Sequence, residues 1–441
     1  MNKMILKLAV PNIISNITVP LIGLVDLALM GHLGADKYIG AIALGTIIFN
    51  FIYWGFGFLR MSVSGFTAQS VGAQNNRESA LILLRGLLIS VGLSLLIILL
   101  QIPIERLSFK FIEGSAEVEQ LAAAYFRIRI WAAPATLGLY VLNGWFLGMQ
   151  NARLVMISSV LSNVFNVLFS YLFVYVWHFN SSGVALGTVL AQYLGLFVSL
   201  IFLRRNYGDL FQCIDMKGLL NIDFLKRFFR VNTDIFIRTL CVILVFSLFT
   251  SKSAGINDHV LAVNTILLQF LMFFSFFIDG LAFAGEALVG KFVGSDDLLS
   301  FRRLFRRLWL WGFMLALIFS VFYWLGNRLI ISVLTDNEEI YQTVQTFLPW
   351  VVLLPLVSFG SYVWDGIYIG FTASRPMRNS MLAASILLFA PAFFFLPALI
   401  GSHALWLSLV LFLLGRTLFQ TFLFPRVLRE AFGSVQTRWW K

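Results

Sequence analysis

The sequence predicts an all-α integral membrane protein, with twelve transmembrane helices arranged as two pseudo-symmetric six-helix lobes. The first observation is composition, since 59% of the 441 residues are hydrophobic and only 12% are charged. Soluble domains carry about 25% charged residues, so this chain lacks the polar groups needed to cover a surface that faces water. Ordinary soluble enzymes, nucleic-acid-binding proteins and disordered proteins are therefore excluded. A β-barrel is disfavoured too, because its strands alternate apolar and polar residues.

The second observation is a series of apolar windows, each long enough, at about 20 residues, to cross a bilayer as a helix. The longest polar connection, Arg204 to Lys226, follows the sixth window. We therefore expect an N-lobe at 1–204, a cytoplasmic linker at 205–226 and a C-lobe at 227–441. The windows fall at roughly 8–31, 39–64, 80–103, 121–149, 152–177, 183–203, 229–251, 259–289, 306–326, 341–371, 378–399 and 402–425.

Basic residues give the orientation of these windows. Of the 32 Lys and Arg, only Lys37, Arg106, Lys110, Lys252 and Arg328 fall in loops on the side opposite the N-terminus. Basic residues gather on the cytoplasmic side of membrane proteins, so both termini are expected in the cytoplasm, with the chain multi-pass in the inner (plasma) membrane. The net charge of +11 then reflects topology and some affinity for anionic lipid, not nucleic-acid binding. No cleavage site follows the first apolar stretch, which is expected to remain as a helix.

The third observation is a weak internal repeat at an offset of about 218–222 residues. Six spans per half is an even number, so the two halves enter the membrane from the same side and form parallel repeats. Transporters often place the substrate path between such halves, which favours alternating access. The matches are Asn12 with Asn232, Gly72 with Gly290, Pro134 with Pro355, and Asn143-Gly144 with Asp365-Gly366.

One group of polar residues in the N-lobe is typical of a cation site. A charged group at a helix centre costs at least about 2.5–3.5 kcal/mol, so Asp26 in the first span needs an explanation. At 1.5 Å per residue, Ser170 and Thr188 lie at about the same depth as Asp26, with Asn166 one turn deeper and Asn163 on the same stripe. Desolvation raises a carboxyl pKa, so these five residues could form a proton or Na⁺ site. The alternative is a structural aspartate packed between helices.

Other intramembrane charges give weaker indications. Arg60 and Asp279 occupy nearly equivalent repeat positions, and we expect them to pair across the lobes as an inner gate; local pairing of each is the alternative. Asp234 and Arg238 stand four residues apart on one predicted helix, which indicates a local ion pair.

The tenth span offers a candidate for the C-lobe cavity. Asp365 lies in its inner half, with Ser361 one turn before it and Tyr368 three residues after it. These three residues are expected to line the cavity, and a purely structural role is equally consistent with the pattern.

Several segments resemble the multidrug and toxic compound extrusion (MATE) transporters and, within them, the DNA-damage-inducible F (DinF) subfamily. The likeness extends over essentially the whole chain. The segments are Val25-Asp26-Leu27-Ala28-Leu29-Met30-Gly31-His32-Leu33-Gly34, Phe58-Leu59-Arg60-Met61 through Gly65-Phe66-Thr67-Ala68-Gln69, Trp364-Asp365-Gly366-Ile367-Tyr368-Ile369-Gly370 and Met377-Arg378-Asn379-Ser380-Met381.

This resemblance implies two six-helix lobes around a central cleft and cation-driven export of amphipathic, often cationic compounds. It implies that Asp26 is the coupling residue and that Thr188 matches a threonine of the family's sixth helix. Family members often carry Asn-x-x-x-Asp in the fifth helix, whereas here Asn166 is followed by Ser170. The missing carboxylate favours a proton site on Asp26. Na⁺ coupling at Asp26 or Asp365 stays open, because some Na⁺-coupled members use a carboxylate in the C-lobe.

The preferred hypothesis is a proton/drug antiporter that binds small amphipathic organic substrates and membrane lipids and works as a monomer. No cofactor is expected besides the coupling ion, H⁺ or alternatively Na⁺. The alternatives are a Na⁺-coupled drug antiporter and a flippase for a lipid-linked substrate. An enzyme is disfavoured, because the adjacent acids Asp296 and Asp297 lie near arginines on an expected cytoplasmic loop. Cys213 and Cys241 show no metal-ligand spacing.

Overall fold

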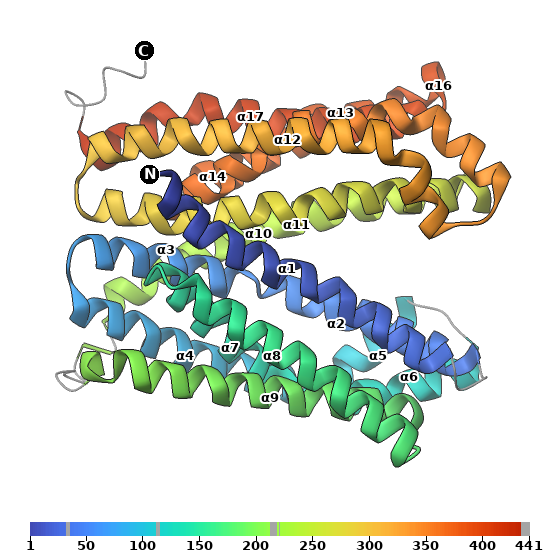
Figure 1. Ribbon diagram of the computed structural model, residues 1–441, viewed down its shortest axis with the longest axis horizontal. Helices are drawn as coiled ribbons and strands as arrows, with labels where there is room; N and C mark the ends of the chain where they lie inside the picture. The colour runs from blue at the N-terminus through green and yellow to red at the C-terminus, as the bar shows by residue number, and fades with distance from the viewer. Residues whose placement is uncertain (32–35, 112–114, 212–217, 220, 434–441) are drawn as a thin grey trace. The chain divides into compact units, whose positions relative to one another are not determined.

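The computed structural model describes residues 1–31, 36–111, 115–211, 218–219 and 221–433, and all regular structure within these ranges is helical (Figure 1). Twelve segments of the described chain are long and apolar enough to cross a membrane, which confirms the number of predicted spans. In the first half, the helices are α1 (Asn2–Gly31), α2 (Asp36–Gly55), α3 (Phe58–Gly72), α4 (Asn76–Leu99), α5 (Gln101–Phe111), α6 (Ala116–Arg129), η1 (Ile130–Ala132), α7 (Ala133–Gly148), α8 (Ala152–Tyr171), η2 (Leu172–Val176), α9 (Asn180–Tyr207) and η3 (Gly208–Phe211).

The second half continues in the same way, with longer helices. Its helices are α10 (Ile222–Ala254), α11 (Asp258–Gly294), α12 (Leu298–Leu334), α13 (Glu338–Gly370), α14 (Ser374–Ala383), η5 (Ala384–Phe389), α15 (Ala390–Phe395), α16 (Pro397–Ile400) and α17 (His403–Phe432).

The structure differs from the predicted windows at α2 and α3 and at the short helix α5. The window at 39–64 is divided, because α2 ends at Gly55 and α3 begins at Phe58, with Gly57 adjoining α3 as its N-cap. Glycine destabilises a helix interior by roughly 0.5–1 kcal/mol relative to alanine, so a pair at 55 and 57 is a natural place for a break. The short helix α5 was not predicted. It lies outside the twelve candidate spans of the described chain.

The chain forms two compact units. One unit comprises Ile14–Lys226, and the other comprises Met1–Ile13 together with Arg227–Lys441. Two continuous helices therefore contribute to both units: α1, of which only residues 2–13 belong to the second unit, and α10, of which residues 222–226 belong to the first.

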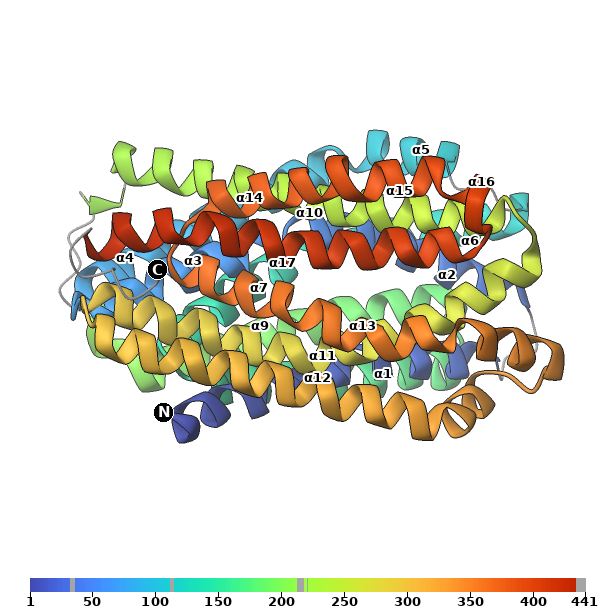
Figure 2. The same ribbon diagram turned by 90° about the horizontal axis from the view of Figure 1, so that it is seen from above.

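A central helix organises the packing in each unit. In the first unit α7 packs against α3, α4 and α9, and α8 lies along α9. In the second, α13 packs against α11, α12 and α17, which run side by side in Figure 2. Each central helix carries a fully buried tryptophan, Trp145 on α7 and Trp364 on α13.

Close helix contacts fix the register of the internal repeat. A Cβ atom on Gly148 would lie 2.8 Å from the carbonyl oxygen of Ser64, and one on Gly370 would lie 2.9 Å from that of Glu286. Real Cβ atoms essentially never come so close, so only glycine permits these approaches of α7 to α3 and of α13 to α11. The two contacts are related by an offset of 222 residues on both helices.

The same offset relates the ends of the paired helices. Asn75 and Asp297 cap the N-termini of α4 and α12, and each accepts a hydrogen bond from the backbone N–H three residues later, which satisfies one of the unpaired donors of the first turn. In this register Gly72, the last residue of α3, corresponds to Gly294. The predicted match of Gly72 with Gly290 is therefore wrong by one helical turn.

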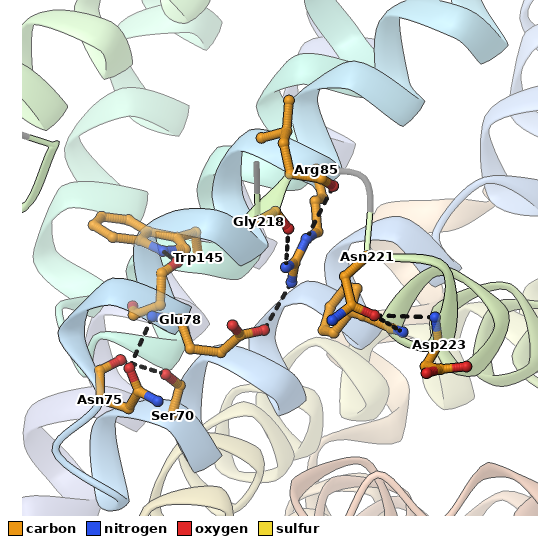
Figure 3. Close-up of polar contacts among 11 residues, drawn as sticks. Ser70, Asn75, Glu78, Arg85, Trp145, Gly218, Asn221 and Asp223 are labelled. Atoms are coloured by element: carbon orange, nitrogen blue, oxygen red, sulfur yellow. Dashed lines mark hydrogen bonds and ion pairs between the residues drawn. The ribbon is translucent and has the colours of Figure 1, made fainter. Parts of the chain in front are cut away.

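A buried arginine fixes the end of the polar connection to α4 (Figure 3). The side chain of Arg85 is only 3% exposed. Its Nη2 donates to the carbonyl oxygen of Gly218 over 2.7 Å and its Nε to that of Leu219 over 3.3 Å, while Nη1 bonds Glu78 Oε1 over 2.7 Å. The guanidinium carbon lies 4.1 Å from the ring centre of Phe224 in the first turn of α10. Arg85 thus holds the residues that lead into α10 against the first unit.

Candidate functional site

Polar side chains of α1, α8 and α9 meet inside the first unit. Asn163 Nδ2 donates to Thr18 Oγ1 over 2.7 Å, which joins α8 to α1. Asn166 Nδ2 donates to Thr188 Oγ1 over 3.0 Å, which joins α8 to α9, and Thr188 donates to the carbonyl oxygen of Val184. The structure therefore brings Asn163, Asn166 and Thr188 into one polar group, to which Thr18 adds a hydroxyl that the sequence analysis missed.

Two oxygen atoms of this group have no hydrogen-bond partner within the described part of the chain. They are Oδ1 of Asn166 and Oγ of Ser170, and both residues are buried. Gly187 on α9 lets the helices approach at this level, since a Cβ atom there would lie 2.8 Å from Ser170 Oγ. A buried oxygen that accepts no hydrogen bond costs free energy of folding. These two atoms are therefore suited to accept a hydrogen bond from a protonated group or to coordinate a cation.

The side chain of Asp26 lies outside the described residues, but the backbone register of α1 is known. Besides the contact between Asn163 and Thr18, the hydroxyl of Tyr175 donates to the carbonyl oxygen of Leu29 over 2.9 Å. The first contact joins Thr18 to Asn163, and the second joins Leu29 to Tyr175 of η2, which continues α8. Residue numbers increase together along both helices, so α1 and α8 run in the same direction. Between the two contacts the backbone of Asp26 falls near the level of Ser170. A coupling role for Asp26 stays a prediction.

The second unit contains a buried ionic cluster around Asp365 of α13. One carboxylate oxygen, Oδ2, accepts a hydrogen bond from Nη2 of Arg416 over 2.7 Å and another from Nη2 of Arg238. The other oxygen, Oδ1, accepts from Nε2 of Gln420 over 2.9 Å. Asp365 and Arg416 are 6% and 4% exposed. Two guanidinium groups from α10 and α17 thus neutralise this carboxylate.

Ser361 and Tyr368, which were predicted to line a cavity with Asp365, form hydrogen bonds to other groups. The Ser361 hydroxyl donates to the carbonyl oxygen of Ser358 within its own helix, and the Tyr368 hydroxyl donates to the carbonyl oxygen of Gln420 over 2.6 Å. Both side chains are buried, and neither hydrogen-bonds Asp365. They serve helix packing beside the cluster.

The predicted local pair of Asp234 and Arg238 is wrong. Arg238 bonds Asp365, whereas Asp234 accepts from Nη1 of Arg378 over 2.6 Å and from Oγ of Ser374 over 2.8 Å, both on α14. A pair at i, i+4 on a helix is worth only about 0.2–0.5 kcal/mol. A buried carboxylate needs direct hydrogen bonds to all its oxygens, and partners on other helices supply them.

Arg60 and Asp279 belong to different compact units, and their pairing across the lobes stays a prediction. Within the repeat, the two positions differ by three residues. Gly144 packs on the backbone of Arg60 and Gly366 on the backbone of Ala282, so Ala282 corresponds to Arg60, and Asp279 lies three residues earlier. The same contacts confirm the match of Asn143-Gly144 with Asp365-Gly366.

Arg416 is the functional candidate that the sequence analysis left unassigned. An arginine inside an apolar span must find an acid, and this rule could have paired it with Asp365. Within the described residues, no group of three or more His, Cys, Asp or Glu side chains is placed to hold a metal ion. A Na⁺ ion at Asp365 would have to displace guanidinium groups.

Comparisons with known proteins agree on one family. The MatE family model matches residues 11–172 and 235–394. The chain is 38% identical over 425 residues to DNA damage-inducible protein F of Escherichia coli K12, with 95% of this chain and 90% of that protein covered. It is 22% identical to the probable multidrug resistance protein NorM of Acinetobacter baylyi, with 92% of each covered.

Solved structures share the fold. An outward-facing conformation of a multidrug resistance MATE family transporter of the MOP superfamily superposes with a TM-score of 0.84 at 20% identity, with 98% of this chain and 96% of that chain covered. A MATE crystal structure in the bent conformation gives 0.86 at 18% identity, with 98% and 95% covered. With twelve apolar helices, a matching fold and a family match across both halves, this chain belongs to the MATE family of multidrug and toxic compound transporters.

Proposed function

We propose that this transporter exports amphipathic, often cationic compounds by proton antiport, with Asp26 as the group that binds and releases the proton. The observation that carries the choice of ion is the contrast between the two units. In the second unit, Asp365 is neutralised by Arg238 and Arg416. In the first unit, the polar group on α8 and α9 offers oxygens and amides but no second carboxylate.

The side chains available around α8 and α9 support a proton site more than a Na⁺ site. Na⁺ prefers several oxygen ligands and gains from more than one negative charge. Where the resemblance to MATE transporters implies an acid in the fifth helix, this sequence has Ser170. The helices α8 and α9 contain no Asp or Glu, so Asp26 of α1 is the acid proposed for this group. One carboxylate is sufficient to bind and release a single proton, and Asp26 supplies it in this proposal.

The cycle then follows from linkage. Facing outwards, the carboxylate takes a proton, loses its charge and weakens the binding of a cationic substrate, which leaves. Facing inwards, it releases the proton to the cytoplasm and can bind the next substrate. A proton and a substrate that bind in alternation exchange across the membrane, since each disfavours the state that binds the other.

The remaining features of the proposal follow from this cycle and from the charge distribution. The distribution of basic residues supports cytoplasmic termini, in a chain that crosses the inner membrane. Two pseudo-symmetric units make a monomer sufficient, and the membrane lipids are its only other expected partners. No cofactor besides the coupling ion is needed, and transport requires no catalytic residue.

Export of a cationic dye from proteoliposomes tests the proposal. An imposed pH gradient is compared with an imposed Na⁺ gradient for the wild type, for Asp26→Asn and for the control Asp258→Asn, which removes an exposed acid at the start of α11. We expect efflux driven by the pH gradient, lost in Asp26→Asn and retained in the control. Efflux driven only by Na⁺ would refute proton coupling. Efflux by neither gradient from folded protein would refute dye export and make a flippase for a lipid-linked substrate the next candidate.

A further inference from the structure

Basic side chains gather where α1 begins beside α12. Lys3 and Lys7 stand one turn apart on α1, and Arg303 and Arg307 stand one turn apart on α12. All four side chains are exposed. Both segments belong to the same compact unit, so their arrangement is defined.

A direct contact joins the two helices at this point. Nε1 of Trp311 donates to Oδ1 of Asn2 over 3.4 Å, and the first turn of α1 lies along α12 (Figure 2). Arg307 is one turn before Trp311 on the same side of α12, and Lys3 directly follows Asn2. Lys3, Lys7 and Arg307 therefore lie within about two helical turns of a single contact, at 5.4 Å per turn.

This contact has the character of a membrane interface. With 37 residues, α12 is about 55 Å long and exceeds the roughly 30 Å hydrocarbon core, so its first turns project beyond the core. Tryptophan is enriched at the level of the lipid headgroups. Lys7 lies one turn further into α1, and a lysine at such a position extends its ammonium group back towards the headgroups.

Within the described residues, few acidic side chains stand against these four charges. Residues 2–25 of α1 and 298–311 of α12 contain no Asp or Glu. Asp297 precedes α12, and hydrogen bonds from Ser300 lower its pKa, with Arg303 as a further cause. Asp297 is therefore ionised and balances Arg303 in part. Lys3, Lys7 and Arg307 form no hydrogen bond or ion pair with the part of the chain that the structure describes.

We propose that Lys3, Lys7 and Arg307, beside the contact between Trp311 and Asn2, form a binding site for the phosphate of an anionic membrane phospholipid. Arg307 can donate two parallel hydrogen bonds to phosphate oxygens, and the lysines add positive charge around them. The acyl chains would lie along the exposed apolar surface of α12 above Trp311, which includes Phe313, Met314, Leu317 and Ile318.

This site has a consequence for transport, whichever ion drives it. The first residues of α1 belong to the second unit, and residues from Ile14 onwards belong to the first. A lipid that binds Lys3, Lys7 and α12 together stabilises the packing of the first residues of α1 within the second unit. Since the same helix carries Asp26, an anionic lipid would influence the helix of the proposed coupling residue.

Lipid retention by the full-length protein tests the site. Purified protein in detergent is mixed with equal amounts of dioleoyl phosphatidylglycerol and dioleoyl phosphatidylcholine, and bound lipids are counted by native mass spectrometry. We expect the wild type to prefer phosphatidylglycerol. Lys7→Gln/Arg307→Gln should weaken its binding about 25-fold, at roughly fivefold for each basic residue. Lys7→Arg/Arg307→Lys, which keeps both charges, should lose much less affinity than the Gln variant, because only the paired hydrogen bonds of Arg307 are removed.

The matched control is Arg204→Gln/Arg205→Gln, which removes two exposed cations from the end of α9 in the other unit. It should bind phosphatidylglycerol as the wild type does. Equal losses in both double variants would show general charge attraction and overturn the site, as would equal binding of the two lipids by the wild type. If the Gln double variant does not purify folded, Arg307→Gln alone should show the fivefold loss. Dye efflux is not the readout, so a failure of the proposed function leaves this result interpretable.

Discussion

Replacing Asp365 by asparagine should destabilise the second unit strongly. The substitution preserves shape but removes the negative charge that Arg238 and Arg416 share, and it leaves two guanidinium groups without an acid. The side chain of Arg416 is only 4% exposed, that of Asp365 9% and that of Arg238 14%, so water cannot replace the carboxylate. Breaking a buried ion pair by removing one partner costs roughly 3–5 kcal/mol.

Thermal unfolding in detergent measures this loss. At roughly 2–4 °C for each kcal/mol in a domain of about 150–250 residues, Asp365→Asn should lower the midpoint by roughly 6–20 °C. The control Asp258→Asn alters an exposed acid, for which changes within about 0.5 kcal/mol are usual. The double variant Asp365→Asn/Arg416→Met should recover part of the loss, because it removes one of the two unpaired cations.

An Asp365→Asn midpoint within 2 °C of the wild type, on the order of 1 kcal/mol or less, would refute the reasoning. It would mean that the carboxylate is not the partner on which both arginines depend. It would also remove the argument that Asp365 is unavailable to a coupling ion. A loss that the double variant does not recover would locate the damage in packing instead of charge.

Three further outcomes test other parts of the structure. Gly148→Leu should destabilise by at least about 1–3 kcal/mol through overpacking of α7 on α3, whereas Gly92→Leu, with open space around it, should not; equal midpoints would contradict the register of the repeat. Ser170→Asp should add Na⁺-driven dye efflux by restoring a second carboxylate, and efflux unchanged under a Na⁺ gradient would count against a cation site beside α8. Arg85→Gln should speed proteolytic cleavage near Gly218 severalfold, since two hydrogen bonds to backbone carbonyls are lost; cleavage at the wild-type rate would show that Arg85 does not hold this segment.

The number of spans was predictable from the sequence, because each transmembrane helix needs about 20 consecutive apolar residues, and runs of that length are rare outside membranes. The division between α2 and α3 was not. It falls within an apolar run, at Gly55-Phe56-Gly57, so hydropathy does not change there. The two glycines were the only local sign. The first turns of α12 were also missed, since the helix begins at Leu298 and the predicted window began at 306, after Arg302 and Arg303.

The candidate sites were predictable to different degrees. Asn166 and Thr188 are joined by a hydrogen bond, although the count of residues along each span placed Asn166 one turn deeper than Thr188. Depth follows from the rise of a helix only to within about one turn, because the ends of the spans are not fixed by hydropathy. Which charges pair was not predictable in this way. Asp234 and Arg238 are neighbours on α10 but face different helices, and each finds its partner there. Partner choice depends on helix rotation, which sequence spacing does not contain.

The repeat shows why the two units should differ in chemistry. Asn143 and Asp365 occupy equivalent positions on α7 and α13, each one residue before a glycine that packs on the preceding paired helix. Arg416 and Gln420 lie on α17, whereas α9, the corresponding helix of the first unit, carries no charged residue from Asn180 to Leu203. The carboxylate and its partners are thus present together in one unit and absent together in the other. In the second unit the carboxylate of Asp365 is already bound to two guanidinium groups. The proton coupling proposed for Asp26 would use the unit that lacks this cluster.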